Sequence, residues 1–276
     1  MAPSLGVALA ILGVSALVAS AAEPAIKTFM VSGPYQPAPV AIEVLAPDPL
    51  EPGAAYPVLY VLPVESGTIS RWGSGIQEVA KADIAKRYGV ICVAPAFAAT
   101  PWFANHPSDP VLRQEDHFIK VVLPWVEEHY PVKCTRDGRF LLGFSKSGYG
   151  AIMLLLRHPG LFERAVAWDA PVDKTQPDQF RMIDVFGTNE HFAHYAIPGL
   201  IPQRINELKD AALPRLILMP NGDTGHKMNA VHEQLLALGI PHMYEKTDSI
   251  QHHWNSGWVP RASKLVLTGK ADPESR

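Results

Sequence analysis

The clearest chemical feature of the sequence is a serine at the centre of a short segment of small residues. Ser145 lies within Gly143-Phe144-Ser145-Lys146-Ser147-Gly148, between a strand-like run at 139–144 and a second apolar run at 151–156. A strand, a sharp turn and a buried helix in this order are typical of a nucleophile elbow, which projects the serine hydroxyl above the edge of a sheet. We therefore predict that Ser145 is a nucleophile. An ordinary Gly/Ser loop is the alternative interpretation.

Two later loops offer the partners that a serine nucleophile needs. The hydroxyl requires a base to take its proton, and the base requires an orienting carboxylate. Asp223 follows a strand-like run closely and precedes the adjacent His252 and His253, which gives the chain order serine, acid, histidine. We predict Asp223 as the acid, with Asp169 as the rival. Either histidine could be the base, and an Asn-Gly-Asp turn also occurs without chemistry.

The oxyanion of a tetrahedral intermediate needs two preorganised N–H donors. We expect one to be the backbone N–H of Lys146, directly after the nucleophile. The other should come from the loop after the third strand, where Pro63 has no N–H to give. This leaves Val64 and Glu65, of which we prefer Glu65. The Lys146 side chain could favour anionic substrates, although a solvated ammonium is the simpler interpretation.

Other polar and aromatic residues are predicted to surround the site. We expect Trp102, His253 and Trp254 to line the substrate pocket. We expect no cofactor and no metal, because the His191 and His194 pair has no evident third ligand. These two histidines are predicted to be lid or surface residues.

Strand-like and helical segments alternate along the chain. Apolar runs typical of buried strands occupy residues 57–62, 90–94, 139–144, 165–168 and 215–219, with further strand-like runs at 26–31, 40–45 and 242–246. Helical spacing occurs at 73–88, 111–130, 147–157, 227–238 and 256–267, and Pro124 is expected to kink the second of these helices. This alternation predicts an α/β fold with a mostly parallel central sheet and helices on both faces.

The N-terminus differs from the rest of the chain. Residues 5–18 are apolar and are followed by Ala19-Ser20-Ala21-Ala22, which is typical of a secretory signal peptide. We predict a cleaved signal over residues 1–22, a secreted or periplasmic protein, and no stable membrane insertion after cleavage. A retained anchor is the alternative, but 14 apolar residues are short for a span of about 20. Residues 23–276 are predicted to form a single catalytic domain, with an irregular, lid-like insertion at 171–213.

Composition excludes some classes of partner. The chain has 276 residues, 47% of them hydrophobic, and a formal net charge of −3, so it can build a large core. It has no basic block of the kind that binds nucleic acid, so we expect no nucleic-acid partner. We expect Cys92 and Cys134 to be free thiols, the first as a core residue.

Three segments carry a resemblance to a known family. The elbow continues into Arg157-His158-Pro159-Gly160-Leu161-Phe162, a strand leads into Asp223, and the chain later reads His252-His253-Trp254. These segments resemble the esterase D-like branch of the α/β-hydrolases, which includes feruloyl esterases, S-formylglutathione hydrolases and mycolyltransferases. The resemblance implies an α/β-hydrolase fold and hydrolysis of a carboxylic ester through an acyl-enzyme. The segment His252-His253-Trp254 is similar to the family's H-x-W ending, and this similarity favours His252 as the base.

Two departures from the family pattern lie close to the predicted site. The family's His-Gly after the third strand is Pro63-Val64 in this sequence, and its second elbow glycine is Ser147. The oxyanion loop and the elbow are therefore atypical.

The sequence thus predicts a secreted serine esterase that acts on a small-molecule or polysaccharide-linked ester. A peptidase of the prolyl-oligopeptidase type is one alternative, and we expect no separate gating domain of the kind it would need. A non-catalytic binding protein on a hydrolase scaffold is the other. Against it, serine, acid and histidine are all present in the expected order.

Overall fold

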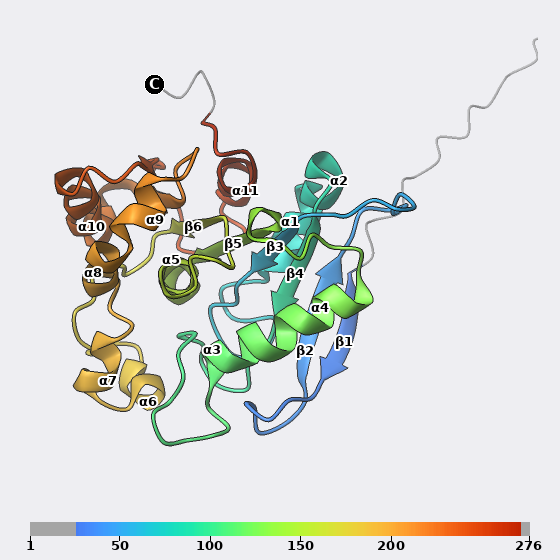
Figure 1. The fold of residues 1–276 in the computed structure, drawn as a ribbon, viewed down its shortest axis with the longest axis horizontal. Coiled ribbons are helices and arrows are strands. Elements are labelled where there is room, and N and C mark those ends of the chain that lie inside the picture. The colour runs from blue at the N-terminus through green and yellow to red at the C-terminus, as the bar shows by residue number, and fades with distance from the viewer. Residues whose placement is uncertain (1–25, 272–276) are drawn as a thin grey trace, which may run out of the picture.

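The computed structural model describes residues 26–271, without the side chains of residues 223 and 224. The predicted signal peptide, residues 1–22, lies outside the described residues. An eight-stranded sheet forms the centre, in the order β1-β2-β4-β3-β5-β6-β7-β8 (Figure 1). Its strands are β1 (Lys27–Val31), β2 (Val40–Leu45), β3 (Val58–Val61), β4 (Ile91–Pro95), β5 (Arg139–Phe144), β6 (Arg164–Trp168), β7 (Leu216–Met219) and β8 (His242–Tyr244).

The sheet is mostly parallel, as predicted. Strands β3 to β8 run parallel to one another, whereas β2 pairs antiparallel with both β1 and β4. Every residue of β3, β4, β5, β6 and β7 is buried. This explains why these segments read as continuous apolar runs in the sequence, because a parallel strand covered on both faces has no solvent side to present.

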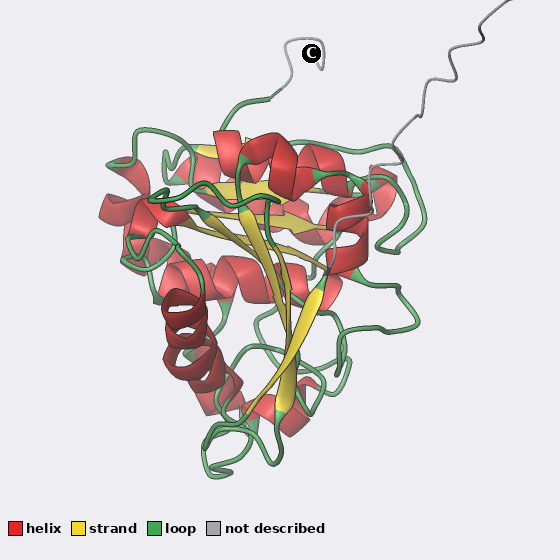
Figure 2. Ribbon diagram, turned by 90° about the vertical axis from the view of Figure 1, so that its right-hand side faces the viewer, coloured by secondary structure: helices red, strands yellow, loops and turns green. Residues whose placement is uncertain are grey.

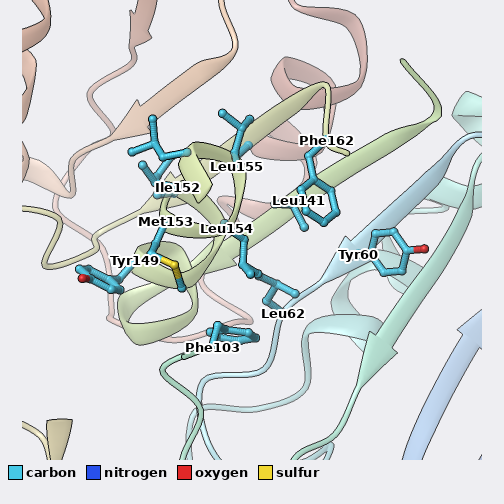
Figure 3. Packing of buried hydrophobic residues seen from close by; sticks show 14 of the residues in the cluster. Tyr60, Leu62, Phe103, Leu141, Tyr149, Ile152, Met153, Leu154, Leu155 and Phe162 are labelled. Carbon is cyan, nitrogen blue, oxygen red and sulfur yellow. The ribbon is translucent and has the colours of Figure 1, made fainter. Parts of the chain in front are cut away.

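Helices cover both faces of the sheet, and Figure 2 shows this layering from the side. The helices are α1 (Gly75–Lys81), α2 (Ile84–Tyr88), α3 (Gln114–His117), α4 (Leu123–His129), α5 (Ser145–Arg157), α6 (Met182–Phe186), α7 (Asn189–Ala193), α8 (Ile197–Leu200), α9 (Ile205–Lys209), α10 (His226–Ala237) and α11 (Val259–Thr268). One apolar cluster joins the sheet to α4, α5 and α10, and a second joins it to α1, α2 and α11. Figure 3 shows part of the first cluster, where Leu154 of α5 lies among Leu62, Leu141 and Phe103.

Two predicted helices are divided in the structure. The segment 73–88 forms α1 and α2, which are separated at Asp83 with a left-handed φ of 53°. The segment 111–130 forms α3 and α4, joined by a π-helical turn at Phe118–Val122. The turn ends two residues before Pro124, whose missing N–H interrupts the regular α-helical hydrogen bonds. The predicted irregularity near this proline is therefore present as a π-turn.

The 171–213 segment lies between β6 and β7 and carries the short helices α6 to α9. It packs beside α5, where the hydroxyl of Tyr149 donates to the backbone oxygen of Tyr195 at 2.7 Å (Figure 1). Phe192 and Ile197 of this insertion are fully buried in the same cluster as α5. The insertion is thus anchored to the helix that begins at Ser145.

Candidate active site

Ser145 occupies a strained turn between a central strand and a buried helix. It directly follows β5 and is the first residue of α5. Its φ is 52°, a conformation that a non-glycine residue rarely adopts. This is the geometry of a nucleophile elbow, in which the turn presents the side chain at the carboxyl edge of the sheet.

Small residues allow the strand and the helix of this elbow to approach closely. A side chain at Gly143 would clash with the backbone oxygen of Ser147, because β5 and the first turn of α5 are in direct contact there. A Cβ at Gly148 would lie 2.7 Å from the Cβ of Ala170. The two glycines are therefore required by packing.

Ser147, the residue that departs from the usual glycine, adds hydrogen bonds to the turn. Its side-chain oxygen accepts from the backbone N–H of Phe144 at 3.1 Å and donates to the backbone oxygen of the same residue at 2.9 Å. The serine is fully buried. The departure from the family pattern thus closes the elbow with two side-chain contacts that glycine cannot make.

The acid that meets His252 is Asp169. The two atoms Nδ1 of His252 and Oδ2 of Asp169 lie 2.7 Å apart. Asp169 directly follows β6, and Phe144 of β5 pairs with Trp168 of β6 in the sheet. Ser145 and Asp169 therefore leave the sheet from neighbouring positions at its carboxyl edge.

The contact of His252 with Asp169 differs from the predicted pairing with Asp223, whose side chain lies outside the described part of the chain. Asp223 lies in the 3₁₀ turn Gly222–Gly225, in the loop after β7, one strand further from the elbow. Asn221 of the same loop reaches the pair, because its Nδ2 donates to Oδ2 of Asp169 at 3.1 Å. The rival acid could be named from the sequence because it ends a strand-like run, but its contact with the histidine depends on the order of strands.

Hydrogen bonding keeps the Asp169 carboxylate in its charged form. Burial raises the pKa of this carboxyl, but the hydrogen bonds with His252 and Asn221, together with the charges of His252 and Lys227, outweigh burial and hold the pKa below its usual value. An ionised carboxylate at Nδ1 orients the imidazole and stabilises its protonated form.

Aromatic side chains surround the His252 ring. Phe144 approaches it edge-on with ring centroids 5.0 Å apart, Trp72 does so at 5.5 Å, and Trp168 stacks on it at 6.0 Å. The contact with Phe144, the residue before Ser145, places the ring beside the elbow. In the part of the chain that the structure describes, no hydrogen bond joins Ser145 to this ring. Such contacts often tighten only when substrate binds.

His253 is turned away from this arrangement. Its Nδ1 accepts a hydrogen bond from the backbone N–H of Asn255 at 3.3 Å. Its ring lies against Gly73, where an added Cβ would be 2.8 Å from Cε1 of the imidazole. Of the two adjacent histidines, His252 is thus the one that contacts a carboxylate, as a base requires.

The residues predicted for the oxyanion hole lie close to one another. Lys146 is in the first turn of α5, where backbone N–H groups have no partner within the helix. The loop after β3 begins where Leu62 donates its N–H to Leu142 of β5, next to the elbow. Val64 of this loop is buried, and Oε1 of Glu65 lies 3.8 Å from Nζ of Lys146. A cavity behind this part of the loop is also lined by Trp254.

Trp102 does not line an open pocket, contrary to the prediction. It is fully buried and packs against Tyr149 and Phe186. In the structure the 171–213 insertion covers it, and the indole Nε1 donates to the backbone oxygen of Phe180 at 3.3 Å.

The remaining predicted groups have ordinary environments. Within residues 26–271, no group of three or more His, Cys, Asp or Glu side chains could hold a metal ion. Nε2 of His191 lies 2.7 Å from the backbone oxygen of Asn105. Cys92 is buried and Cys134 exposed, and both are free thiols. None of the described helices combines the length and the apolar character that a membrane span requires.

A serine elbow and an Asp–His contact at the carboxyl edge of a mostly parallel, helix-covered sheet define the α/β-hydrolase class. The family model described as "Putative esterase" matches residues 36–258. The chain therefore belongs to this esterase family, and the resemblance to the esterase D-like branch is confirmed.

Individual relatives agree with the family. Esterase Rv1288 of Mycobacterium tuberculosis is 29% identical over 133 residues, which are 47% of this chain and 29% of that protein. The chain thus matches less than a third of the length of this relative. Among solved structures, the fluorophosphonate-binding serine hydrolase FphF of Staphylococcus aureus has a TM-score of 0.73 at 17% identity, covering 88% of this chain and 98% of that one. A ferulic acid esterase has a TM-score of 0.69 at 20% identity, covering 89% and 97%.

Proposed function

We propose that this protein hydrolyses carboxylic esters through the set Ser145, His252 and Asp169. The observation that carries the proposal is the 2.7 Å contact between His252 and Asp169 beside the strained serine elbow. Membership of the esterase family supports the reaction class.

We also propose export through a signal peptide at residues 1–22, which the apolar run at 5–18 supports. N-terminal sequencing of protein exported by the native host should find a start at residue 22 or 23.

The residues divide the reaction between them. Ser145 attacks the ester carbonyl carbon while Nε2 of His252 takes the hydroxyl proton, and Asp169 stays ionised beside the imidazolium. Backbone N–H groups of Lys146 and of Val64 or Glu65 stabilise the oxyanion. The imidazolium then gives its proton to the leaving alcohol, which leaves an acyl-enzyme. A water molecule, deprotonated by the same histidine, releases the acid and restores Ser145.

The substrate class is proposed at a coarse level. We propose a small-molecule or polysaccharide-linked ester, with the 171–213 insertion as a lid-like cover anchored to α5. The alternative, that this fold carries peptidase activity, is tested by the experiment below.

Covalent labelling with a fluorophosphonate probe tests the nucleophile. The wild-type protein should be labelled at one serine, and Ser145→Ala should lose both the label and esterase activity, with a fall in kcat on the order of 10⁴ to 10⁶. Thermal unfolding should be nearly unchanged, because the Ser145 side chain has no hydrogen-bond partner in the described structure. A panel of p-nitrophenyl esters and peptide anilides then separates esterase from peptidase.

Ser147→Gly is the matched control for this experiment. It removes the neighbouring hydroxyl and restores the usual family pattern, so it should keep the label. Labelling that persists in Ser145→Ala would contradict the assignment of the nucleophile. A folded wild-type protein that takes no label and cleaves neither class of substrate would support the non-catalytic alternative.

A further inference from the structure

Glu65 brings together side chains from two separate segments. Its Oε1 lies 3.3 Å from Nε1 of Trp72, 3.3 Å from an Nη atom of Arg71 and 3.8 Å from Nζ of Lys146. Trp72 and Arg71 belong to the same 62–73 loop as Glu65, whereas Lys146 belongs to the elbow helix α5. The carboxylate thus connects the two segments from which we expect the oxyanion donors.

The far end of the 62–73 loop is attached to the loop that carries the histidine. The backbone oxygen of Trp72 accepts from the N–H of Trp254 at 3.0 Å. The indole ring of Trp72 meets the His252 ring edge-on at 5.5 Å. Because Trp72 also donates to Glu65, a single residue contacts both the carboxylate and the proposed base.

The middle of the loop is held to the segment that follows β4, the strand next to β3. The N–H of Gly67 donates to the backbone oxygen of Phe97 at 3.1 Å. The position of Val64 and Glu65 relative to α5 therefore depends on contacts at the end of the loop that faces Lys146.

Partial burial gives the contact between Glu65 and Lys146 more weight than a surface pair would have. The two side chains are 25% and 13% exposed, so solvent screens them less than it does a fully exposed pair. Burial lowers the pKa of Lys146, Arg71 lowers it further, and the Glu65 carboxylate counteracts both. Glu65 thus stabilises the charge of a partly buried ammonium next to the nucleophile.

We propose that Glu65 is a positioning residue for the oxyanion hole. Its carboxylate holds the 62–73 loop against α5 so that the N–H of Lys146 and that of Val64 or Glu65 face one point, and through Trp72 it links this arrangement to His252. The inference rests on the proposed esterase function. It concerns a loop that departs from the family pattern at Pro63-Val64, where the proline has no N–H to contribute.

A role in positioning predicts a specific kinetic signature. Misplacing preorganised groups by about 1 Å can cost on the order of 10² in rate, and losing one oxyanion donor costs about 10² to 10³. Glu65→Ala should therefore lower kcat about 10- to 100-fold with KM changed less than about threefold. Affinity for a boronic acid that forms a tetrahedral adduct with Ser145 should fall by a similar factor.

Glu65→Gln separates the charge from the shape of the side chain. Its amide oxygen can still accept from Trp72, but it loses the ion pairs with Arg71 and Lys146. We expect a loss of kcat between those of the wild type and Glu65→Ala. Glu78→Ala is the matched control, because it removes another ion pair, with Lys81 on α1. It should leave kcat and boronic-acid affinity within about twofold.

The outcomes distinguish this proposal from the proposed function. A Glu65→Ala protein with wild-type melting temperature, kcat and boronic-acid affinity overturns the positioning role, while fluorophosphonate labelling of Ser145 in that protein still supports the esterase. A rise in KM alone would also overturn it, since it would make Glu65 a substrate-binding residue. If Glu65→Ala fails to fold, the same measurements on Glu65→Gln decide.

Discussion

Among the side chains that the structure describes, two carboxylates each meet a histidine ring at nearly the same distance. Asp169 lies 2.7 Å from His252 at the carboxyl edge of the sheet, and Glu115 lies 2.8 Å from His158 beneath the 171–213 insertion. The two pairs differ in their other partners. The distance between carboxylate and imidazole therefore does not by itself distinguish a structural pair from one suited to catalysis.

Glu115 is committed to holding elements together. Its side chain is 4% exposed and accepts from Arg157 with both oxygens, at 2.6 and 3.1 Å. The hydroxyl of Tyr195 donates to it at 3.1 Å. These partners come from the end of α5 and from the insertion, so the carboxylate charge is balanced by a fixed guanidinium. His158 in the R-H-P-x-x-F turn is one member of this network.

Asp169 has a different set of partners. A neutral amide, that of Asn221, donates to the same oxygen that meets His252. The His252 side chain is 35% exposed, so its ring is accessible at the edge of the sheet. The negative charge of Asp169 is thus available to an imidazolium that forms during a reaction. The comparison indicates that the additional donors around a carboxylate decide between the two roles.

Replacing the acid of the first pair should have the largest effect. Asp169→Asn keeps the size of the side chain but removes the charge that orients His252, and kcat should fall on the order of 10⁴. Steady-state ester hydrolysis measures this. Asp223→Asn, a matched change in the neighbouring loop, should stay within a few-fold of the wild type. The reverse result would make Asp223 the acid, and the contact between Asp169 and His252 would then be structural, like that between Glu115 and His158.

Replacing the acid of the second pair, Glu115, should lower the stability of the fold and leave catalysis nearly unchanged. Glu115→Ala leaves the Arg157 guanidinium without its carboxylate in a largely buried site, and breaking such a pair costs about 3 to 5 kcal/mol. Urea unfolding measures the change, and kcat per folded molecule should stay within about threefold. A Glu115→Ala protein that is as stable as the wild type but inactive would show that both pairs serve catalysis.

A smaller effect is expected from a histidine close to Glu115. His117 on α3 is fully buried, its two ring nitrogens lack hydrogen-bond partners in the described structure, and burial lowers its pKa to about 4. The unfolded chain binds a proton near pH 6.5, where the folded protein does not, so stability is present above that pH and falls as pH drops towards 4. The loss should reach about 3 kcal/mol at most.

His117→Phe removes this titration and tests its size. The difference in unfolding free energy between pH 7 and pH 4 should be smaller in the variant than in the wild type, as measured by urea unfolding at both values. Glu115 contributes to the same acid sensitivity, because its pKa is lowered by His158 and Arg157 despite burial. An identical pH dependence in both proteins would show that folding does not lower the pKa of His117.

Much of the architecture follows from local sequence. The apolar run 139–144 and the small residues after it predict β5, the elbow and α5, because strand burial and a tight turn leave their pattern in adjacent residues. The alternation of strands and helices predicts a parallel sheet for the same reason. The choice of His252 over His253 as the base came from the family resemblance. The His252 ring meets the Asp169 carboxylate, and its role as the base stays a prediction.

The pairings across the chain required the tertiary structure. Asp169 and His252 are separated by 83 residues, and their contact depends on which strands are neighbours and how two loops turn above the sheet. The burial of Trp102 depends on an insertion that packs over its loop from 78 residues away. The sequence by itself therefore determined most of the elements and the serine elbow, because short-range sterics and hydrophobic periodicity encode them. Only the folded chain decided which acid meets the base, because that contact depends on the order of the strands in space.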